Sequence, residues 1–353
     1  MTKPEVTIVV SPRERFSYTR QSLESIYENT KYPFSLVYVD GGSPKNIKKY
    51  LETQSTEKGF QLIITEHYLS PNQARNIGLK EVKTKYIVFI DNDVNVAPGW
   101  LEKIIKCAAE TEATVVCPLV CIGKNLHQKI HLAGGEARIE LQIKGDKLLH
   151  KVHEKHYFVN RLVADVQDKL QRQKCEFAEF HCMLVKTSIF DEIGCIDEGL
   201  LNTREHIDFC LTVTKAGGTI YCEPNSVVTY VPGPPFVFSD IPFFMLRWSD
   251  EWELASLEYF VDKWDLGRDL NTGKKQQKYL LKDKYFKKRY DRLGHRRHQA
   301  FLKPLIRNFF FGQSNPWLEK NLLPLERKLN RFITSRYSQS KKNNSSKHSA
   351  VSY

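Results

Sequence analysis

Two aspartates separated by one residue directly follow a short apolar run. The run extends from Tyr86 to Ile90, and Asp91 and Asp93 come immediately after it. Unbroken apolar residues over this length are typical of a strand buried on both faces. Side chains at positions i and i+2 of an extended chain point to the same side. The two carboxylates could therefore bind Mg²⁺ or Mn²⁺, and the cation could bind a diphosphate.

The same residues also fit an ordinary turn. Asp and Asn are favoured in turns, and Pro98 is typical of the first position of a following helix. The two interpretations can be separated only by the elements that surround the pair.

Strands and helices alternate through the first third of the chain. Strands are predicted at residues 6–10, 36–39, 62–65, 86–90 and 114–117. Helical patterns lie between them, and strict alternation predicts an α/β fold with a doubly wound, mostly parallel sheet. Ligands bind such sheets outside the carboxyl ends of the strands. Because Asp40, Asp91 and Asp93 all follow strands, they are expected to meet at one site.

Several other kinds of site are disfavoured. No Gly-x-Gly-x-x-Gly or Walker loop is present, which argues against a dinucleotide enzyme or a P-loop NTPase. Residues 121–174 contain five histidines whose spacings fit no standard zinc pattern, so this segment is expected to be a solvated insertion. The five are His127, His131, His150, His153 and His156.

Composition indicates a globular protein of 353 residues that has one large or two medium domains. The formal charge of +12 suggests an anionic partner. Eight scattered cysteines without a C-x-x-C pair are interpreted as reduced core residues of a cytoplasmic protein. No N-terminal signal is recognisable, and prolines together with Asp240 interrupt the apolar segment 227–246, so no transmembrane helix is predicted.

Four short motifs resemble those of family-two inverting glycosyltransferases with the GT-A fold, and they follow the order seen in that family. They are Val6–Pro12, Val37–Ser43, Ala74–Gly78 and Phe89–Asp93 with Pro98 downstream. The resemblance implies a hexosyltransferase of glycan biosynthesis that moves a sugar from a nucleoside diphosphate sugar to a hydroxyl acceptor. It also implies nucleotide-sugar binding by Pro12, Asp40, Arg75, Asp91 and Asn92, and Mn²⁺ or Mg²⁺ binding by Asp91 and Asp93.

In the second half of the chain, strands are predicted at residues 219–222 and 226–230, and residues 177–185 resemble the strand of the family that leads to the acceptor side. The resemblance places a catalytic base near residue 205. Glu205, His206 and Asp208 open a predicted helix where the family carries a Glu-Asp pair, although a capping role for the acids is the alternative. Glu205 is the favoured base, and His206, which stands where the second acid is common, is the next candidate. Tyr230 replaces the histidine that often completes the metal ligands of the family.

The glycosyltransferase domain is predicted to cover residues 1–235, followed by a helical, basic extension over 236–336 and a disordered tail over 337–353. The basic extension could contact an anionic membrane face or remain solvated, and no nucleic-acid-binding module is recognised. Its most basic part contains Lys282, Lys284, Lys287, Lys288 and Arg289.

Two other functions remain open. A nucleotidyltransferase would usually carry a glycine-rich basic loop after the first strand, and residues 11–15 are basic but contain no glycine. A catalytically silent protein that binds a glycan or another partner with the same fold is favoured by His206 and Tyr230.

Overall fold

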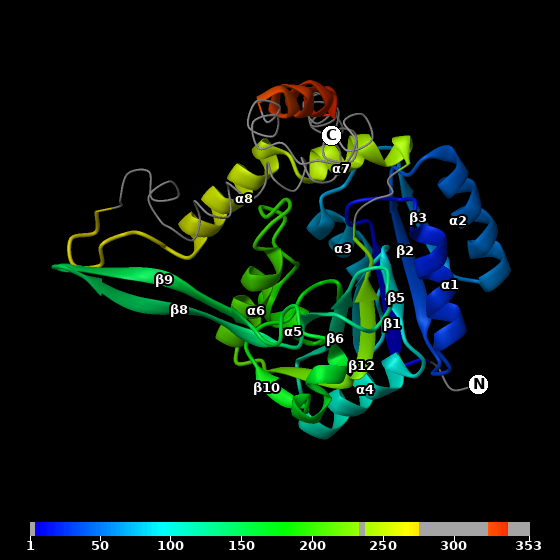
Figure 1. Ribbon diagram of the computed structural model, residues 1–353, viewed down its shortest axis with the longest axis horizontal. Coiled ribbons are helices and arrows are strands. Elements are labelled where there is room, and N and C mark those ends of the chain that lie inside the picture. The colour runs from blue at the N-terminus through cyan, green and yellow to red at the C-terminus, as the bar shows by residue number, and fades with distance from the viewer. Residues whose placement is uncertain (1–3, 233–236, 275–323, 338–353) are drawn as a thin grey trace, which may run out of the picture.

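The computed structural model describes residues 4–232, 237–274 and 324–337. A mixed sheet forms the centre of the molecule (Figure 1). The first part of the chain contains β1 (Val6–Ser11), α1 (Thr19–Asn29), β2 (Ser35–Gly41), α2 (Lys45–Lys58), β3 (Gln61–Thr65), α3 (Pro71–Leu79), β4 (Tyr86–Asp91), β5 (Val94–Val96), α4 (Trp100–Thr111) and β6 (Val115–Ile122). The second part contains β7 (Ile130–Leu132), β8 (Gly135–Lys144), β9 (Lys147–His156), β10 (Gln173–Cys175), β11 (Cys182–Lys186), α5 (Ile189–Ile193), α6 (Glu205–Lys215), β12 (Ile220–Tyr230), α7 (Ile241–Arg247) and α8 (Asp250–Lys263). A further helix covers 324–337.

The sheet confirms the predicted α/β class. Its order is β10-β12-β6-β11-β4-β1-β2-β3, and β1 pairs in parallel with both β2 and β4. The antiparallel strand β11 lies between β4 and β6, so the second half of the sheet is mixed. Every residue of β1 and β4 is buried, as the unbroken apolar runs predict.

Three sequence expectations about strands require correction. The fifth strand, β6, continues to Ile122 instead of ending at 117. Residues 219–222 and 226–230 were expected as two strands, but β12 is one strand with a register shift between Glu223 and Val227. Pro224 lies within that shift, and a proline cannot donate a ladder hydrogen bond, which accounts for the bulge. The apolar segment from 177 becomes a strand only at Cys182.

Residues 121–174 form an ordered structure that the sequence did not predict. Strands β8 and β9 make a two-stranded hairpin that projects from the body of the molecule (Figure 1). Its outer part is exposed, with Leu141 61% and Ile143 78% accessible. The turn uses Gly145 at φ +62°, a conformation that glycine adopts without strain.

Helix α3 lies very close to the sheet because position 78 has no side chain. A Cβ atom on Gly78 would lie 2.3 Å from Val9 Cγ1. We therefore expect Gly78→Ala to lower the free energy of unfolding by about 1 to 3 kcal/mol through overpacking. Chemical denaturation measures this loss. The loss caused by Gly78→Ala should be smaller in a chain that already carries Val9→Ala than in the wild-type chain. A Gly78→Ala loss that is undiminished in the Val9→Ala background would contradict the steric explanation.

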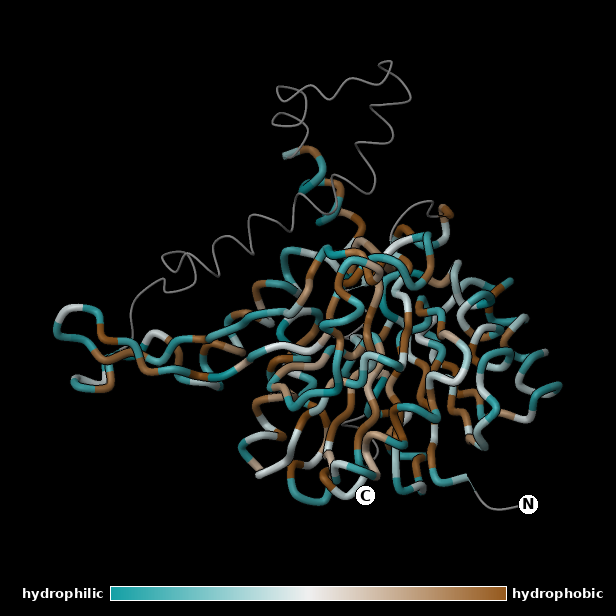
Figure 2. Tube along the Cα trace, turned by 60° about the horizontal axis from the view of Figure 1, so that its bottom comes forward, coloured by the Kyte–Doolittle hydropathy of each residue, from teal (hydrophilic) through white to brown (hydrophobic). Residues whose placement is uncertain are grey.

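Helices α7 and α8 pack against the sheet domain along its upper edge in Figure 1. Leu257, Phe260 and Val261 of α8 belong to the same hydrophobic cluster as the sheet. In Figure 2 the hydrophobic residues are concentrated in the sheet domain and the helices that cover it. None of the described helices combines the length and apolar character needed to cross a bilayer.

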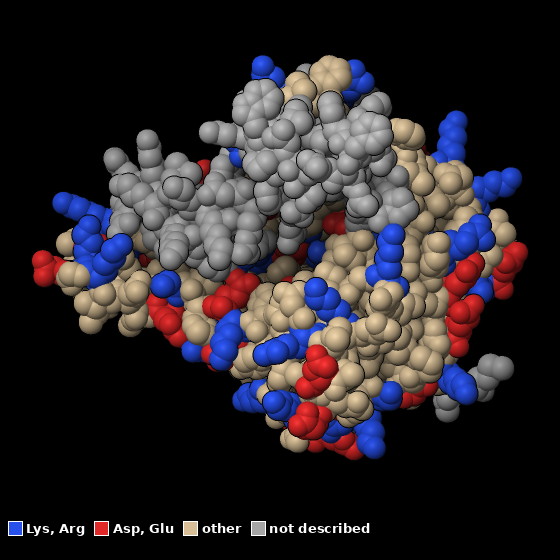
Figure 3. Space-filling model, in the orientation of Figure 1, with Lys and Arg blue, Asp and Glu red and all other residues tan. Residues whose placement is uncertain are grey.

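The predicted membrane-contacting residues lie outside the described part of the chain. These residues, Lys282, Lys284, Lys287, Lys288 and Arg289, fall within 275–323, and most of the predicted disordered tail falls within 338–353. On the described surface, Lys and Arg residues are interspersed with Asp and Glu residues (Figure 3). All eight cysteines are unpaired, and seven of them are buried.

Candidate active site

Asp40 and Asp91 lie at the same carboxyl edge of the sheet, on strands that are separated by β1. Asp40 lies near the end of β2, and Asp91 ends β4. Asp40 is buried and accepts hydrogen bonds from the Ser43 backbone N–H at 3.0 Å and the Ser43 hydroxyl at 2.8 Å. Gly41 lies beside Pro12, and a Cβ atom at position 41 would stand 2.9 Å from Pro12 Cγ. A side chain at position 41 would therefore be too close to Pro12 unless one of the two residues shifted.

Asp91 is held by three side chains. Its Oδ2 accepts from Arg13 Nη1 at 3.1 Å, and its Oδ1 accepts from Arg75 Nη2 at 3.1 Å. His181 Nδ1 lies 3.2 Å from Oδ2. Although burial alone would raise the pKa of Asp91, His181 and the two guanidinium groups hold it well below its usual range. Asp91 is therefore ionised, and each of its two oxygens accepts a hydrogen bond from an arginine.

Removing Arg75 should destabilise the fold. The guanidinium group is fully buried, contacts Asp91 and lies 4.0 Å from the centre of the Phe180 ring. We expect Arg75→Ala to cost about 3 kcal/mol or more, because loss of one partner leaves a buried charge undercompensated. Chemical denaturation gives the value. As a control, Lys106→Ala removes the exposed pair with Glu110 and should cost less than about 1 kcal/mol; equal losses would contradict the assigned role.

Asn92 fixes the loop that follows β1. Its Oδ1 accepts from the Arg13 backbone N–H at 3.1 Å, and its Nδ2 donates to the Arg15 carbonyl at 2.8 Å. The side chain is buried, so it acts on the shape of the loop. The loop in turn carries Arg13 toward Asp91.

Asp93 differs from Asp91 in having unused oxygens. Its carboxylate is fully buried, and neither oxygen has a hydrogen-bond partner within the described ranges. Burial, followed by the neighbouring charge of Glu14, raises the pKa of Asp93 well above its usual value. A buried carboxylate without partners is costly, and a divalent cation would satisfy it. The residues present therefore fit Mg²⁺ or Mn²⁺ at Asp93 better than at Asp91.

Tyr230 is already engaged in another contact. It ends β12, and its hydroxyl donates to Glu14 Oε1 at 2.8 Å. Burial and the charge of Glu14 raise the pKa of Tyr230 well above its ordinary value, so the phenol remains neutral. Its ring stacks on His181 with 4.2 Å between ring centres. His181, from the turn before β11, thus lies beside position 230, where the resemblance predicts a metal-binding histidine.

The three candidate bases lie in the first turn of α6. Glu205 Oε1 lies 3.3 Å from Arg247 Nη2 of α7, and Asp208 accepts from Lys263 Nζ of α8 at 2.7 Å. His206 lies between two carboxylates, with Nδ1 3.8 Å from Glu205 Oε1 and Nε2 3.9 Å from Glu179 Oε1. Glu205 and His206 are therefore neighbours, whereas Asp208 is paired with a different helix.

The charge states of the two acids differ. Although burial alone would raise the pKa of Glu205, His206, Arg247 and Arg75 lower it to about 2. Burial raises the pKa of Asp208, which Lys263 opposes. Asp208 also accepts from Trp264 Nε1 at 2.8 Å. Both oxygens of Asp208 thus accept hydrogen bonds from the end of α8, which indicates that Asp208 has a structural role.

Sequence reasoning missed a cluster formed by His131, Glu179 and His181. One ligand atom from each of these residues lies within 4.8 Å of the others. His131 comes from β7, and the other two come from the turn before β11. A Glu-x-His pair directly before a central strand was a usable signal, but the expectation of a strand over the whole segment from 177 concealed it. The other four histidines of 121–174 do not join a metal cluster among the described residues.

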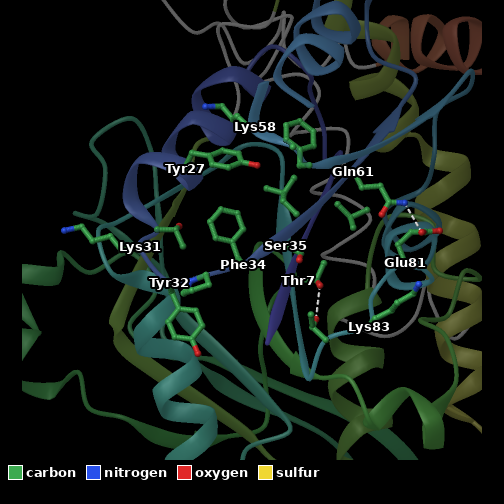
Figure 4. A pocket seen from close by; sticks show the side chains of 17 residues that line it. Thr7, Tyr27, Lys31, Tyr32, Phe34, Ser35, Lys58, Gln61, Glu81 and Lys83 are labelled. Atoms are coloured by element: carbon green, nitrogen blue, oxygen red, sulfur yellow. Dashed lines mark hydrogen bonds between the residues drawn. The ribbon is translucent and has the colours of Figure 1, made fainter. Parts of the chain in front are cut away.

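A large pocket lies away from this site. It measures about 740 Å³ and is lined by residues near the amino ends of β1, β2 and β3. Figure 4 shows Tyr27, Tyr32 and Phe34 around it, with Lys31 and Lys58 at its edge. Asp40 and Asp91 lie at the opposite edge of the sheet, at the carboxyl ends of their strands. This pocket is therefore separate from the acidic site.

Comparison with known proteins identifies the family. The family described as Glycosyl transferase family 2 matches residues 7–194, which is more than half of the chain. The chain therefore belongs to glycosyl transferase family 2, and the GT-A-like fold predicted from the sequence is confirmed.

Individual relatives are distant. The chain is 23% identical over 222 residues to the Sinorhizobium fredii protein y4gI, covering 61% of this chain and 23% of the relative. It is 21% identical over 226 residues to a pre-mycofactocin glycosyltransferase of Mycobacterium tuberculosis, covering 64% of this chain and 42% of the relative. The chain thus spans less than half the length of these relatives.

Two solved structures are similar at lower identity. One is GalNAc-T7 with UDP, GalNAc and Mn²⁺, which matches at 17% identity and a TM-score of 0.49 over 80% of this chain and 57% of that one. The other is S. aureus TarS, which matches at 13% identity and a TM-score of 0.46 over 84% of this chain and 44% of that one.

Proposed function

We propose that this protein transfers a sugar from a nucleoside diphosphate sugar to a hydroxyl group of a glycan or similar acceptor, with inversion at the anomeric carbon. Family membership supports glycosyl transfer, and the observation that carries the proposal is the buried Asp93 carboxylate at the sheet edge, with two oxygens that have no partner in the described chain. The donor would bind along the edge formed by Pro12 and Asp40, and Asn92 would contribute by holding the loop after β1 in place.

The proposed metal is a divalent cation such as Mn²⁺ or Mg²⁺ at Asp93. When bound, it would neutralise charge on the departing diphosphate. Asp91 acts differently, because Arg13 and Arg75 already occupy its oxygens. Asp91 therefore holds Arg13 in place, and Arg13 supplies positive charge next to Asp93.

The proposed base is His206, with Glu205 as its neighbour. Glu205 was favoured on sequence grounds, but its side chain is 4% exposed and Arg247 contacts it, whereas the His206 side chain is 18% exposed. His206 Nδ1 lies 3.8 Å from Glu205 Oε1, and its Nε2 lies 3.9 Å from Glu179 Oε1. An imidazole between two carboxylates can accept a hydroxyl proton and have its cationic form stabilised.

A silent glycan-binding protein is the second candidate. The contact of Tyr230 with Glu14 favours it, because this side chain does not offer the imidazole that relatives provide. A screen of nucleotide sugars with Mn²⁺, following nucleotide release and the anomeric configuration of any product, separates the candidates. Turnover with inversion supports the transferase. Donor or glycan binding without turnover supports the binding protein.

A further inference from the structure

We propose a second metal site, formed by His131, Glu179 and His181, that binds a transition-metal ion such as Zn²⁺ independently of the nucleotide. It is distinct from the cation position at Asp93. Two imidazoles and one carboxylate suit zinc and related ions, whereas Mg²⁺ prefers ligand sets made of oxygen atoms.

The spacing of the donor atoms fits an ion. His131 Nε2 lies 2.8 Å from Glu179 Oε2, and His181 Nε2 lies 3.6 Å from the same oxygen. Ligand atoms that are about 2.0 to 2.2 Å from a tetrahedral zinc ion stand roughly 3.4 Å apart, so the two spacings bracket this value. The donor atoms of the two histidines lie within 4.8 Å of each other, so side-chain rotation could bring all three donors onto one ion.

Glu179 provides an independent indication of a ligand. Its side chain is 8% exposed, and its Oε2 makes no aligned hydrogen bond within the described chain, even though His131 is close. Buried carboxylate oxygens normally accept well-aligned hydrogen bonds, so an oxygen that lies near imidazole nitrogens without this alignment is energetically unfavourable. A cation between these atoms would satisfy all of them.

Asp91 can orient His181 as a metal ligand. In the present arrangement Arg13 Nη1 lies 3.1 Å from His181 Nδ1, which favours a proton on Nε2. Asp91 Oδ2 lies 3.2 Å from the same Nδ1. If the proton moved to Nδ1, Arg13 would give up its hydrogen bond to His181 and keep the one to Asp91 Oδ2. His181 could then donate from Nδ1 to Asp91 and present Nε2 to the ion, as in carboxylate–histidine–metal triads.

The ion would have an open position. Three protein ligands leave one tetrahedral position for water or another small ligand, as in catalytic zinc sites. The His131 side chain is 26% exposed, which gives an entry path for the ion. His206 also approaches Glu179, so the site lies between Asp91 and the proposed base.

The experiment is a titration of the full chain with Zn²⁺ and with Co²⁺, in the absence of nucleotide, followed by calorimetry and cobalt absorption. We expect saturable binding of one ion that Mg²⁺ does not displace. His131→Ala and Glu179→Gln should each weaken it by more than about 100-fold, since loss of outer partners alone costs about 10 to 100-fold. Thermal unfolding of the metal-free variants checks that they are folded.

Two matched variants complete the test. His153 contacts Glu136 at 2.9 Å on the hairpin, so His153→Ala removes a similar pair elsewhere and should leave the affinity unchanged. Asp93→Asn should also leave it unchanged. Absence of saturable binding in the wild-type protein would overturn the proposal. Full affinity in folded His131→Ala and Glu179→Gln would also overturn it. So would loss of the ion in either control, Asp93→Asn or His153→Ala. Because nucleotide is absent, failure here would leave the test of glycosyl transfer unaffected.

Discussion

Asp93→Asn is expected to remove Mn²⁺-dependent binding of a nucleoside diphosphate and to lower turnover at least about 1000-fold, equivalent to roughly 4 kcal/mol of transition-state stabilisation. The reason is that Asp93 supplies the buried carboxylate whose oxygens have no partner in the described chain. An amide has nearly the same shape but carries no charge, so the fold should be retained. Calorimetry of nucleoside diphosphate binding with and without Mn²⁺, together with donor turnover, measures the effect.

The control for this prediction is an exposed aspartate. Asp191→Asn alters the surface of α5 and should leave both measurements unchanged. Removing the metal from the wild-type protein with a chelator should reproduce the Asp93→Asn result. If the variant and the wild-type protein bind nucleotide equally well without Mn²⁺, Asp93 has no metal role and the donor is held by protein groups alone.

The first half of the fold could be predicted from the sequence because its determinants are local. Apolar runs placed β1 and β4, and the acids at the ends of β2 and β4 placed one edge of the sheet. Alternation of strands and helices then predicted that these strands run parallel, because a helical crossover connects strands of the same direction. The family motifs lie in the same region.

The second half required information that local patterns do not carry. Strand β11 pairs with β4 and β6, far away in the sequence, and this pairing brings His181 to Asp91. The hairpin β8–β9 has an exposed outer end with many charged residues between its apolar ones, so its sequence resembles a solvated loop. Burial and pairing of a carboxylate are also tertiary properties. For this reason the sequence could nominate Glu205 and His206 but could not rank them.

Glu205→Gln is expected to act mainly on stability. Since the pKa of Glu205 is lowered to about 2 from an ordinary 4.5, its ionised form favours the folded state. That contribution, roughly 3 kcal/mol, is fully present above pH 4.5 and is lost as the pH falls toward 2. Unfolding of Glu205→Gln should therefore require less denaturant at pH 7, and the difference from wild type should shrink in acid. A constant difference from pH 7 to pH 3 would contradict this assignment.

His206→Asn is expected to lower turnover by roughly 100-fold to 10 000-fold, the range for loss of a general base, while nucleoside diphosphate binding is retained. A base must be deprotonated to work, so activity should fall as the pH drops through its pKa. An imidazole base gives this acid limb in the range of about pH 5 to 8. A Glu205 base would place the limb near pH 2. The pH–rate profile of the wild-type protein therefore distinguishes the two residues before any variant is made.

The variants then test the same assignment independently. Glu205→Gln, measured where it is folded, should retain much more turnover than His206→Asn and should keep the acid limb. His127→Asn is the matched control, because His127 lies between β6 and β7 and its ring contacts Thr229, not Glu205. If Glu205→Gln loses activity to the same extent as predicted for His206→Asn while the latter remains active, the carboxylate is the base. Activity in both variants would point to Asp208, although its contacts with Lys263 and Trp264 argue against that role.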